Sequence, residues 1–322
     1  MKAVVHERYG SPDVLEVREV EQPELADDLV LVRVHAASVN PADWYGVSGR
    51  PWVARAMTGL RRPKNGSVGT DFAGIVEAAG RDVTHVQPGD EVYGARSGAL
   101  AEYVCVRDAI VRKPPNVTFE EAAAVPVAAI TALQGLRDKG KLEQGQRVLI
   151  NGASGGVGTF AVQIAKALGA EVTAVCSTGN VEQARALGAD QVIDYTQEDF
   201  TRGGARYDVL LDVTGTRSWG DYRRVLKPNA RHVIVGAPKG TRLLGPLSHV
   251  IKLRLGSIGS GRKVSFFVAK LNRADLEVLN ELIEAGKVTP AIDRQYDLSE
   301  AADAFRYLGE GHAKAKIGVR GS

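Results

Sequence analysis

The chain has 322 residues, more than a single hydrophobic core usually spans, so two domains are expected. Its composition, 44% hydrophobic and 25% charged, is that of a globular protein, and a net charge of +3 is too small to indicate a nucleic-acid or membrane-surface partner. Two cysteines, Cys105 and Cys176, exclude a disulfide framework and a four-cysteine zinc site. The first residues lack the apolar core of a signal peptide, and no apolar run approaches the roughly 18 residues of a membrane span, so we expect a cytoplasmic protein.

The first third of the chain is predicted to be rich in β-strands. Runs of β-branched residues recur at short intervals, and turn residues such as Pro88-Gly89-Asp90 separate them. These runs are KAVVHE, VLEVREV, LVLVRVHAASV, DFAGIVEAAG, DEVYGA and AEYVCV. Short strands at this spacing predict a compact barrel-like or sandwich domain over residues 1–118.

From residue 119 onward, strand-like and helix-like segments alternate. Residues 119–136 are helix-like, and the strand-like runs after them are RVLIN, EVTAVC, QVIDY, YDVLLDV, HVIVGA and KVSFFVA. This alternation predicts βαβ units and a parallel sheet. An amphipathic helix follows in NRADLEVLNELIEAGKV, and AKAKIGV is expected to form the last strand.

The most informative motif is VLINGASGGVGTFAVQIA, residues 148–165. Its four glycines stand between an apolar strand and a helix, where a dinucleotide-binding fold needs them. Glycines there allow a tight turn, let backbone N–H groups approach a diphosphate, and let the helix pack closely on the strand. The helix N-terminus adds a positive end. We therefore predict that the turn binds a nicotinamide dinucleotide, the alternative being a turn that binds nothing.

The residues after the next strand favour NADPH over NADH. NAD-binding folds place an acidic residue about 20 positions beyond the glycines, where it bonds the ribose 2′-hydroxyl. Here Ser177 and Thr178 occupy this region, and the nearest acid along the chain is Glu182, in the next helix. Hydroxyl and backbone donors suit a 2′-phosphate, whereas a carboxylate would repel it. The alternative is that these hydroxyls only cap the following helix.

Six motifs in a fixed order give the chain a family resemblance. They are AASVNPADWYGVSG, GTDFAGIVEAAG, PGDEVYG, AAAVPVAAITALQGL, GASGGVGTFAVQIAKALGA and LGADQVIDY, and together they span essentially the whole chain. On these residues it resembles the medium-chain dehydrogenase/reductase superfamily, in its zinc-free quinone oxidoreductase-like branch.

The resemblance implies an α/β fold in three stretches. Residues 1–118 would form a GroES-like β-rich substrate domain, and residues 119–286 a Rossmann domain with a doubly wound parallel sheet that binds NADP. Residues 287–322 would return to the substrate domain. It also implies an active site in the cleft between the domains and a homodimer, for which the KVSFFVA strand is the candidate pairing edge.

The resemblance also implies which residues contact the cofactor. The residues near the diphosphate would be Ser154, Gly155, Gly156 and Val157. Those near the 2′-phosphate would be Ser177, Thr178 and Tyr195, and those near the nicotinamide Thr131, Gly236 and Ala237. Alternatively, Tyr195 is a half-buried aromatic at a strand end, and the Thr131 hydroxyl bonds its own helix backbone.

No catalytic zinc is predicted. Zinc alcohol dehydrogenases resemble CGxCHTD where this chain has ASVNPADW, so Asn40 stands near a ligand cysteine, and their GHE is replaced by Gly69-Thr70-Asp71. A catalytic zinc needs three protein ligands and an open position. The side chains that offer ligand atoms, none with ligand spacing, are His35, His85, Cys105 and Asp71.

The predicted chemistry is hydride transfer, which the cofactor performs while the protein stabilises the oxygen that becomes negative. Asn40 and Tyr45 are the candidate catalytic donors: Asn40 matches the family's asparagine in SVNPAD, and Tyr45 an aromatic position of quinone reductases. Asn40 is alternatively a turn residue before Pro41, and Tyr45 a core residue. Asp43 is expected to be a cap or turn residue.

We therefore expect a zinc-independent, NADPH-dependent reductase of quinones or α,β-unsaturated carbonyls. Two alternatives stay open: a zinc-free alcohol or aldehyde oxidoreductase, and a non-catalytic NADPH-binding protein. The stretch from Ser48 to Gly66 has no tyrosine where the family's enoyl thioester reductases carry their catalytic one, which counts against that activity. Its basic residues form either a lid over the substrate or a solvated loop.

Overall fold

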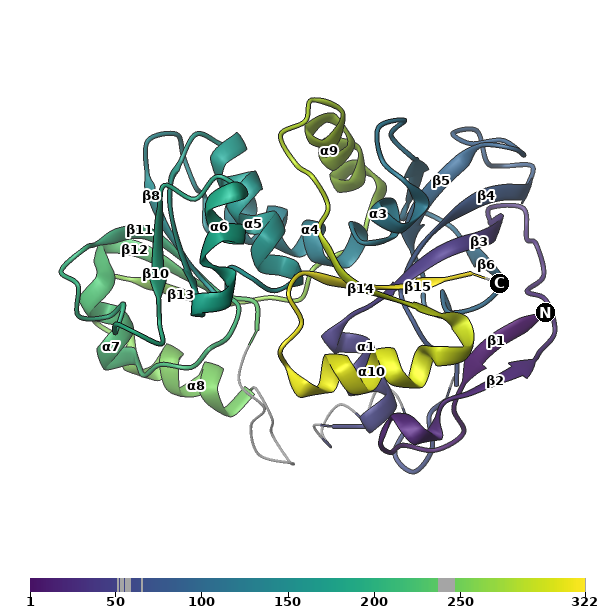
Figure 1. The fold of residues 1–322 in the computed structure, drawn as a ribbon, viewed down its shortest axis with the longest axis horizontal. Coiled ribbons are helices and arrows are strands. Elements are labelled where there is room, and N and C mark those ends of the chain that lie inside the picture. The colour runs from purple at the N-terminus through teal and green to yellow at the C-terminus, as the bar shows by residue number, and fades with distance from the viewer. Residues whose placement is uncertain (51, 53–54, 56–58, 65, 237–246, 322) are drawn as a thin grey trace. The chain divides into compact units, whose positions relative to one another are not determined.

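The computed structural model describes the whole chain except residues 51, 53–54, 56–58, 65, 237–246 and 322 (Figure 1). The chain divides into two compact units. The first consists of Met1–Ile130, Lys270–Gly286 and Pro290–Ser322, and the second of Thr131–Ala269 and Lys287–Thr289. None of the described helices is long and apolar enough to cross a bilayer. Within the stretch predicted as a lid or a basic loop, residues 51, 53–54, 56–58 and 65 lie outside the described residues, whereas Arg55, Arg61, Arg62 and Lys64 lie within them.

The first unit is built on a seven-stranded sheet in the order β14-β15-β3-β4-β5-β7, with β6 also paired to β3. A separate antiparallel pair, β1 (Lys2–Val5) and β2 (Glu16–Glu19), lies outside it. The sheet strands are β3 (Val30–Val39), β4 (Asp71–Ala79), β5 (Glu91–Ala95), β6 (Tyr103–Val106), β7 (Ile110–Arg112), β14 (Ile292–Asp297) and β15 (Lys316–Arg320). This is the GroES-like fold that the sequence predicts.

Strand β3 leads directly into a helix that was not predicted from the sequence. The strand ends at Val39, and α1 (Pro41–Ser48) begins with a proline, which has no N–H to donate and suits the first helical position. Asn40 is the N-cap between them, and its backbone N–H donates to Asp43 Oδ2 at 2.8 Å. Gly49 ends the helix in the left-handed region at φ 61°.

The amphipathic helix α9 (Arg273–Glu284) belongs to the first unit, although the sequence analysis assigned it to the Rossmann domain. Its buried face holds Leu276, Leu279 and Ile283. Tyr93 of β5 donates its hydroxyl hydrogen to Asn280 Oδ1 at 2.7 Å, which ties the helix to the sheet. Helix α3 (Phe119–Ala123) and the start of helix α4 (Pro126–Gln134) also belong to the first unit. The first boundary between the units therefore follows Ile130, whereas the sequence placed it after residue 118.

The chain end returns to the first unit through two strands and a helix. Strand β15 pairs antiparallel with β3 and parallel with β14, and α10 (Ala301–Glu310) packs on both of these C-terminal strands. Phe305 of α10 is fully buried in the same core as Phe72 of β4. Because Ile317 of β15 pairs with Val39 of β3, Lys316 at the start of β15 lies next to Asn40.

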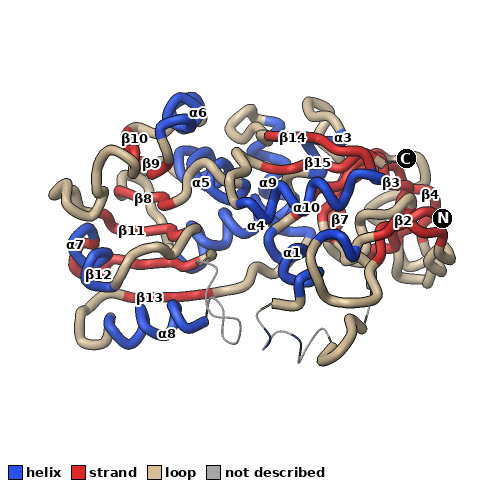
Figure 2. Tube along the Cα trace, turned by 60° about the horizontal axis from the view of Figure 1, so that its bottom comes forward, coloured by secondary structure: helices blue, strands red, loops and turns tan. Residues whose placement is uncertain are grey.

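The second unit is a six-stranded parallel sheet in the order β10-β9-β8-β11-β12-β13. Figure 2 shows these strands in a row, with α5 and α6 beside β8 to β10 and α7 and α8 beside β12 and β13. The strands are β8 (Arg147–Asn151), β9 (Glu171–Cys176), β10 (Gln191–Asp194), β11 (Tyr207–Asp212), β12 (Leu226–Ile234) and β13 (Lys263–Phe266). The helices are α5 (Gly156–Ala167), α6 (Val181–Ala186), α7 (Trp219–Val225) and α8 (Leu247–Gly256). The strand order reverses between β8 and β11, the switch point at which Rossmann folds bind dinucleotides.

Candidate functional site

Three glycines, two in the turn between β8 and α5 and one in the first turn of α5, have three separate structural roles. Gly152 has a φ of 92°, which lets the chain leave the strand in a tight turn. At Gly158 an added Cβ would lie 2.1 Å from the Gly152 carbonyl oxygen, so only glycine allows the helix to pack this closely. At Gly155 an added Cβ would meet nothing nearer than that oxygen at 3.9 Å. The space beside Gly155 is therefore open to a ligand.

The start of α5 offers donors to that space. Gly155 is the N-cap and has no side chain to bond the first amides of the helix. Ser154, Gly156 and Val157 are all half-buried, in line with a surface that a ligand would cover. A free helix N-terminus binds anions because its N–H groups and dipole both face outward. The turn therefore fits the diphosphate of a dinucleotide.

A buried polar cluster around Asp212 lies next to the start of the β8–α5 turn. This cluster was not predicted from the sequence. Asp212 at the end of β11 accepts hydrogen bonds from Asn151 Nδ2 at 2.9 Å and from the Gly215 N–H at 2.8 Å. Its other oxygen lies 3.1 Å from His232 Nε2. Burial would raise the pKa of Asp212, but hydrogen bonds with His232, Tyr222 and the Gly215 N–H hold it below its usual value. Asn151 directly precedes Gly152, so the cluster fixes the residue from which the turn starts.

The candidate 2′-phosphate region contains an acid that the sequence analysis did not place there. Strands β9 and β10 pair in parallel with Asp194 opposite Cys176, which brings this carboxylate beside the next residues. Thr178 donates its hydroxyl hydrogen to Asp194 Oδ2 at 2.6 Å, and this bond holds the pKa of Asp194 below its usual value. Ser177 Oγ accepts from Asn180 Nδ2 at 2.9 Å, so its own hydrogen is not used there.

The other predicted cofactor residues lie in different parts of the chain. Tyr195 follows β10 and is 53% exposed, so it is not the half-buried aromatic of the alternative interpretation. Thr131 lies in α4, at the first position of the second unit. Gly236 follows β12, where an added Cβ would lie 1.9 Å from the Val213 carbonyl oxygen, so no other residue fits. Ala237 lies outside the described residues.

The predicted donor Asn40 belongs to a buried charged cluster in the first unit. Its Nδ2 donates to Asp71 Oδ2 at 2.9 Å, and its Oδ1 accepts from Lys316 Nζ at 2.5 Å. Lys316 Nζ also donates to Asp71 Oδ2 at 2.9 Å. Asn40 is 3% exposed, and the Lys316 and Asp71 side chains are 3% and 0% exposed. Asn40 and Asp71 were candidates from the sequence, whereas Lys316, in the last strand, was not.

Asp43 lies beside this cluster and acts as the expected cap. Its Oδ1 accepts the hydroxyl hydrogen of Thr70 at 2.6 Å, while Oδ2 accepts the Asn40 N–H. Burial raises the pKa of Asp43 to about 6, and the nearby Asp71 adds to the rise. Tyr45 is half-buried on the same helix, where burial raises the pKa of its phenol. The phenol therefore keeps its proton and can donate it in a hydrogen bond.

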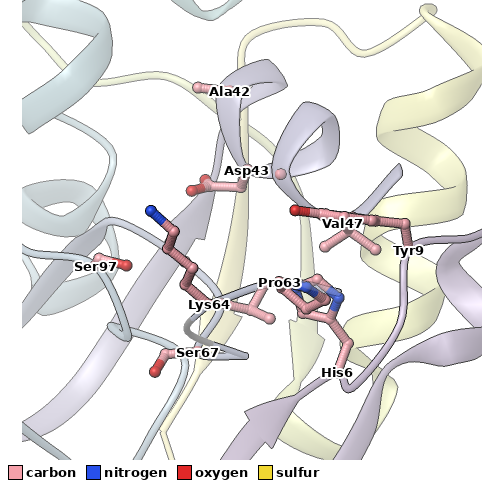
Figure 3. A pocket seen from close by; sticks show the side chains of 12 residues that line it. His6, Tyr9, Ala42, Asp43, Val47, Pro63, Lys64, Ser67 and Ser97 are labelled. Atoms are coloured by element: carbon pink, nitrogen blue, oxygen red, sulfur yellow. The ribbon is translucent and has the colours of Figure 1, made fainter. Parts of the chain in front are cut away.

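A pocket of about 310 Å³ opens on the first unit next to α1 (Figure 3). Asp43 and Lys64 line it together with His6, Tyr9, Ser67 and Ser97, among others. Asn40 and Tyr45 are not among its lining residues. The pocket therefore gives no support to the catalytic roles predicted for them.

The described side chains that could ligate a zinc ion lie apart from one another. In the part of the chain that the structure describes, no three His, Cys, Asp or Glu side chains gather as a metal site. Asp71 is engaged by Lys316, and the His35 ring stacks on Phe119 at 4.8 Å. The Cys105 thiol lies 3.6 Å from the Glu24 carbonyl oxygen. Asp71 and Cys105 thus have other partners, whereas Nε2 of His35 and Nε2 of His85 are buried without a hydrogen-bond partner among the described residues, and zinc independence stays a prediction.

Known families match both units. The family described as "Alcohol dehydrogenase GroES-like domain" matches residues 26–116, and "Zinc-binding dehydrogenase" matches residues 187–319. The mouse protein named "NAD(P)H oxidoreductase RTN4IP1, mitochondrial" is 35% identical, over 99% of this chain and 89% of the relative. The "NADPH-dependent alkenal/one oxidoreductase, chloroplastic" of Arabidopsis thaliana is 33% identical, over 99% of this chain and 79% of the relative.

A solved structure agrees over the full length. The quinone oxidoreductase from Coxiella burnetii has a TM-score of 0.87 and 32% identity, covering 99% of each chain. The chain therefore belongs to the medium-chain dehydrogenase/reductase superfamily, in its quinone oxidoreductase-like branch. The predicted family, the predicted fold class and the assignment as an oxidoreductase are confirmed.

Proposed function

We propose that this protein is a zinc-independent reductase that uses NADPH to reduce quinones or α,β-unsaturated carbonyls. The observation that carries the proposal is the turn at Gly155, where a Cβ would meet open space in front of an uncapped helix N-terminus. Relatives named for alkenal/one reduction and for quinone reduction support the substrate class.

The bound cofactor supplies the hydride, and the protein binds and orients. Gly155, Gly156 and Val157 would hold the diphosphate through backbone N–H groups, with Ser154 beside them. Asp212 keeps Asn151 in place below the turn. For an enone, Asn40 Nδ2 would donate its second hydrogen to the oxygen that becomes negative when the hydride reaches the β-carbon, and Tyr45 is the second candidate donor. The proton that completes the reaction would come from solvent.

Preference for NADPH is proposed on the donors at the end of β9. Ser177 retains a hydroxyl hydrogen for a phosphate oxygen, and the Arabidopsis relative is named as NADPH-dependent. Asp194 acts against this preference, because a carboxylate near a 2′-phosphate raises the cost of binding it. We therefore expect a real but modest preference for NADPH over NADH.

The proposed function is tested by following NADPH and NADH absorbance in the presence of a chelator. The acceptors are a quinone, an enone and a simple aldehyde, with a reaction lacking acceptor as the control. We expect NADPH to be consumed with the quinone or the enone. We expect NADH to be consumed more slowly with the same acceptors. Turnover of the aldehyde alone would support the alcohol or aldehyde oxidoreductase instead. Binding of NADPH without turnover of any acceptor would support a non-catalytic protein.

A homodimer is also proposed, with the edge strand β13 as the pairing surface. Among the described strands β13 pairs with β12 alone, and the neighbouring helix α8 exposes Ile251 and Leu255, which are 52% and 63% exposed. Sedimentation velocity at micromolar concentration should give the mass of a dimer, and a monomer would remove the proposal.

A cytoplasmic location stays a prediction, since the mouse and Arabidopsis relatives are named as mitochondrial and chloroplastic.

A further inference from the structure

The buried ion pair of Lys316 and Asp71 is the most unusual polar feature of the first unit. The two side chains are 3% and 0% exposed, and their charged atoms lie 2.9 Å apart. Transfer of two charges from water costs several kcal/mol per ion, and an apolar pair of similar volume is often as stable. The stability of the fold alone therefore does not explain why this site holds a charged pair.

Three strands bring the pair to Asn40. Asp71 begins β4 opposite Ser38 of β3, and Ile317 of β15 pairs with Val39 of the same strand. Because Asn40 follows β3 directly, its side chain meets Lys316 and Asp71 at the strand ends. Asp71 is held in turn by Ser38 Oγ at 3.1 Å and by the Val127 N–H at 3.0 Å.

The pair acts on both ends of the Asn40 amide. Lys316 donates to Oδ1 at 2.5 Å, and Asp71 accepts one of the two Nδ2 hydrogens at 2.9 Å. A cation accepts no hydrogen bond and an ionised carboxylate donates none, so the charges fix which end of the amide is oxygen. The second Nδ2 hydrogen then has a single direction, and the cation on Oδ1 polarises the amide toward stronger donation.

We propose that Lys316 and Asp71 are positioning residues that hold the Asn40 amide so that its second Nδ2 hydrogen is presented to the acceptor oxygen. The inference rests on the proposed function, in which Asn40 is the donor. It assigns a role to a lysine near the chain end, 276 positions from the side chain that it orients.

A double-mutant cycle tests whether the pair acts through Asn40. The pair is replaced in the variant Lys316→Met/Asp71→Asn, which removes both charges but keeps an acceptor for Asn40 Nδ2. We expect kcat to fall about tenfold or more while the Kd for NADPH stays within about twofold. In the Asn40→Ala background the same replacement should change kcat by less than about twofold, because the residue it acts through is gone. Equal losses of kcat in both backgrounds would overturn the proposal.

A matched control separates positioning from the general loss of a buried lysine. Lys113 in the same unit is 7% exposed and pairs with Glu91 at 3.1 Å. Lys113→Met should change kcat by the same factor in the protein with native Asn40 and in the Asn40→Ala variant. If the double variant does not fold, Lys316→Arg is put through the same cycle. Arginine keeps the positive charge but replaces the ammonium group with a planar guanidinium. A loss of kcat confined to the background with native Asn40 supports the proposal, and equal losses in both backgrounds overturn it.

A readout without turnover separates failure of this inference from failure of the proposed function. With selective ¹⁵N labelling of asparagine, the Asn40 side-chain cross-peaks are identified by their loss in Asn40→Ala. We expect slow hydrogen exchange at Nδ2 in the native protein and exchange at least tenfold faster after the pair is replaced. Unchanged exchange would overturn positioning even in an active enzyme. A protein that reduces no acceptor but shows the change would retain the positioning role and lose the proposed activity.

Discussion

Replacing Asp71 with alanine is expected to lower the free energy of unfolding by about 3–5 kcal/mol. The substitution leaves the Lys316 ammonium buried without its counter-charge. It also removes the acceptor of the Ser38 hydroxyl, the Asn40 amide and the Val127 N–H. The Ser38 hydroxyl keeps the Ala123 carbonyl oxygen as an acceptor at 2.8 Å, but the buried Asn40 amide loses one of its partners, which adds to the cost.

Urea unfolding at neutral pH, followed by tryptophan fluorescence and far-UV circular dichroism, measures this loss. Asp82→Ala is the matched control, because the Asp82 side chain is 64% exposed and changes there stay within about 0.5 kcal/mol. The variant Asp71→Asn/Lys316→Met should recover most of the loss, since no buried charge is left unpaired. A stability for Asp71→Ala within about 1 kcal/mol of the native protein would contradict the buried pair.

Two glycine substitutions three positions apart should both weaken NADPH binding, but only one of them should also lower the stability of the fold. Gly158→Ala places a Cβ 2.1 Å from the Gly152 carbonyl oxygen and 2.7 Å from the Ala153 backbone, so the turn must move. We expect it to lower stability by about 1–3 kcal/mol and NADPH affinity by at least about tenfold. Gly155→Ala meets no atom nearer than 3.9 Å, so the fold is kept and only the approach of the diphosphate is blocked.

Thermal unfolding and fluorescence titration with NADPH separate the two profiles. Gly203→Ala is the control in the same unit, because nothing lies within 4 Å of its added Cβ and its φ is not positive. It should bind NADPH as the native protein does. If Gly155→Ala also bound NADPH with native affinity, the turn would not be the diphosphate site.

The sequence by itself determined the fold class, the family and the glycine turn. These depend on residues that are contiguous, since strand, turn and helix follow one another from residue 147 to residue 167. The three glycine roles are likewise set by local backbone geometry, and the structure assigns them to Gly152, Gly155 and Gly158.

Local patterns were less informative where a short element depends on a cap. No helix was predicted after Asn40, although the segment forms α1 with Pro41 at its first position. The helix is only eight residues long, and its apolar residues form no clear stripe along one face. Its aromatic residues Trp44 and Tyr45 are only half-buried. Its start depends on the bond between the Asn40 N–H and Asp43, and the expectation that Asp43 is a cap or turn residue did not by itself predict a helix.

Only the tertiary structure decided what surrounds the candidate donor and the 2′-phosphate region. Lys316 reaches Asn40 because β15 pairs with β3, and Asp194 reaches Thr178 because β10 pairs with β9. Helix α9 joins the first unit because its apolar face and Asn280 find partners there. Strand pairing brings together residues 16 to 276 positions apart, and periodicity along the chain carries no record of which strands will pair.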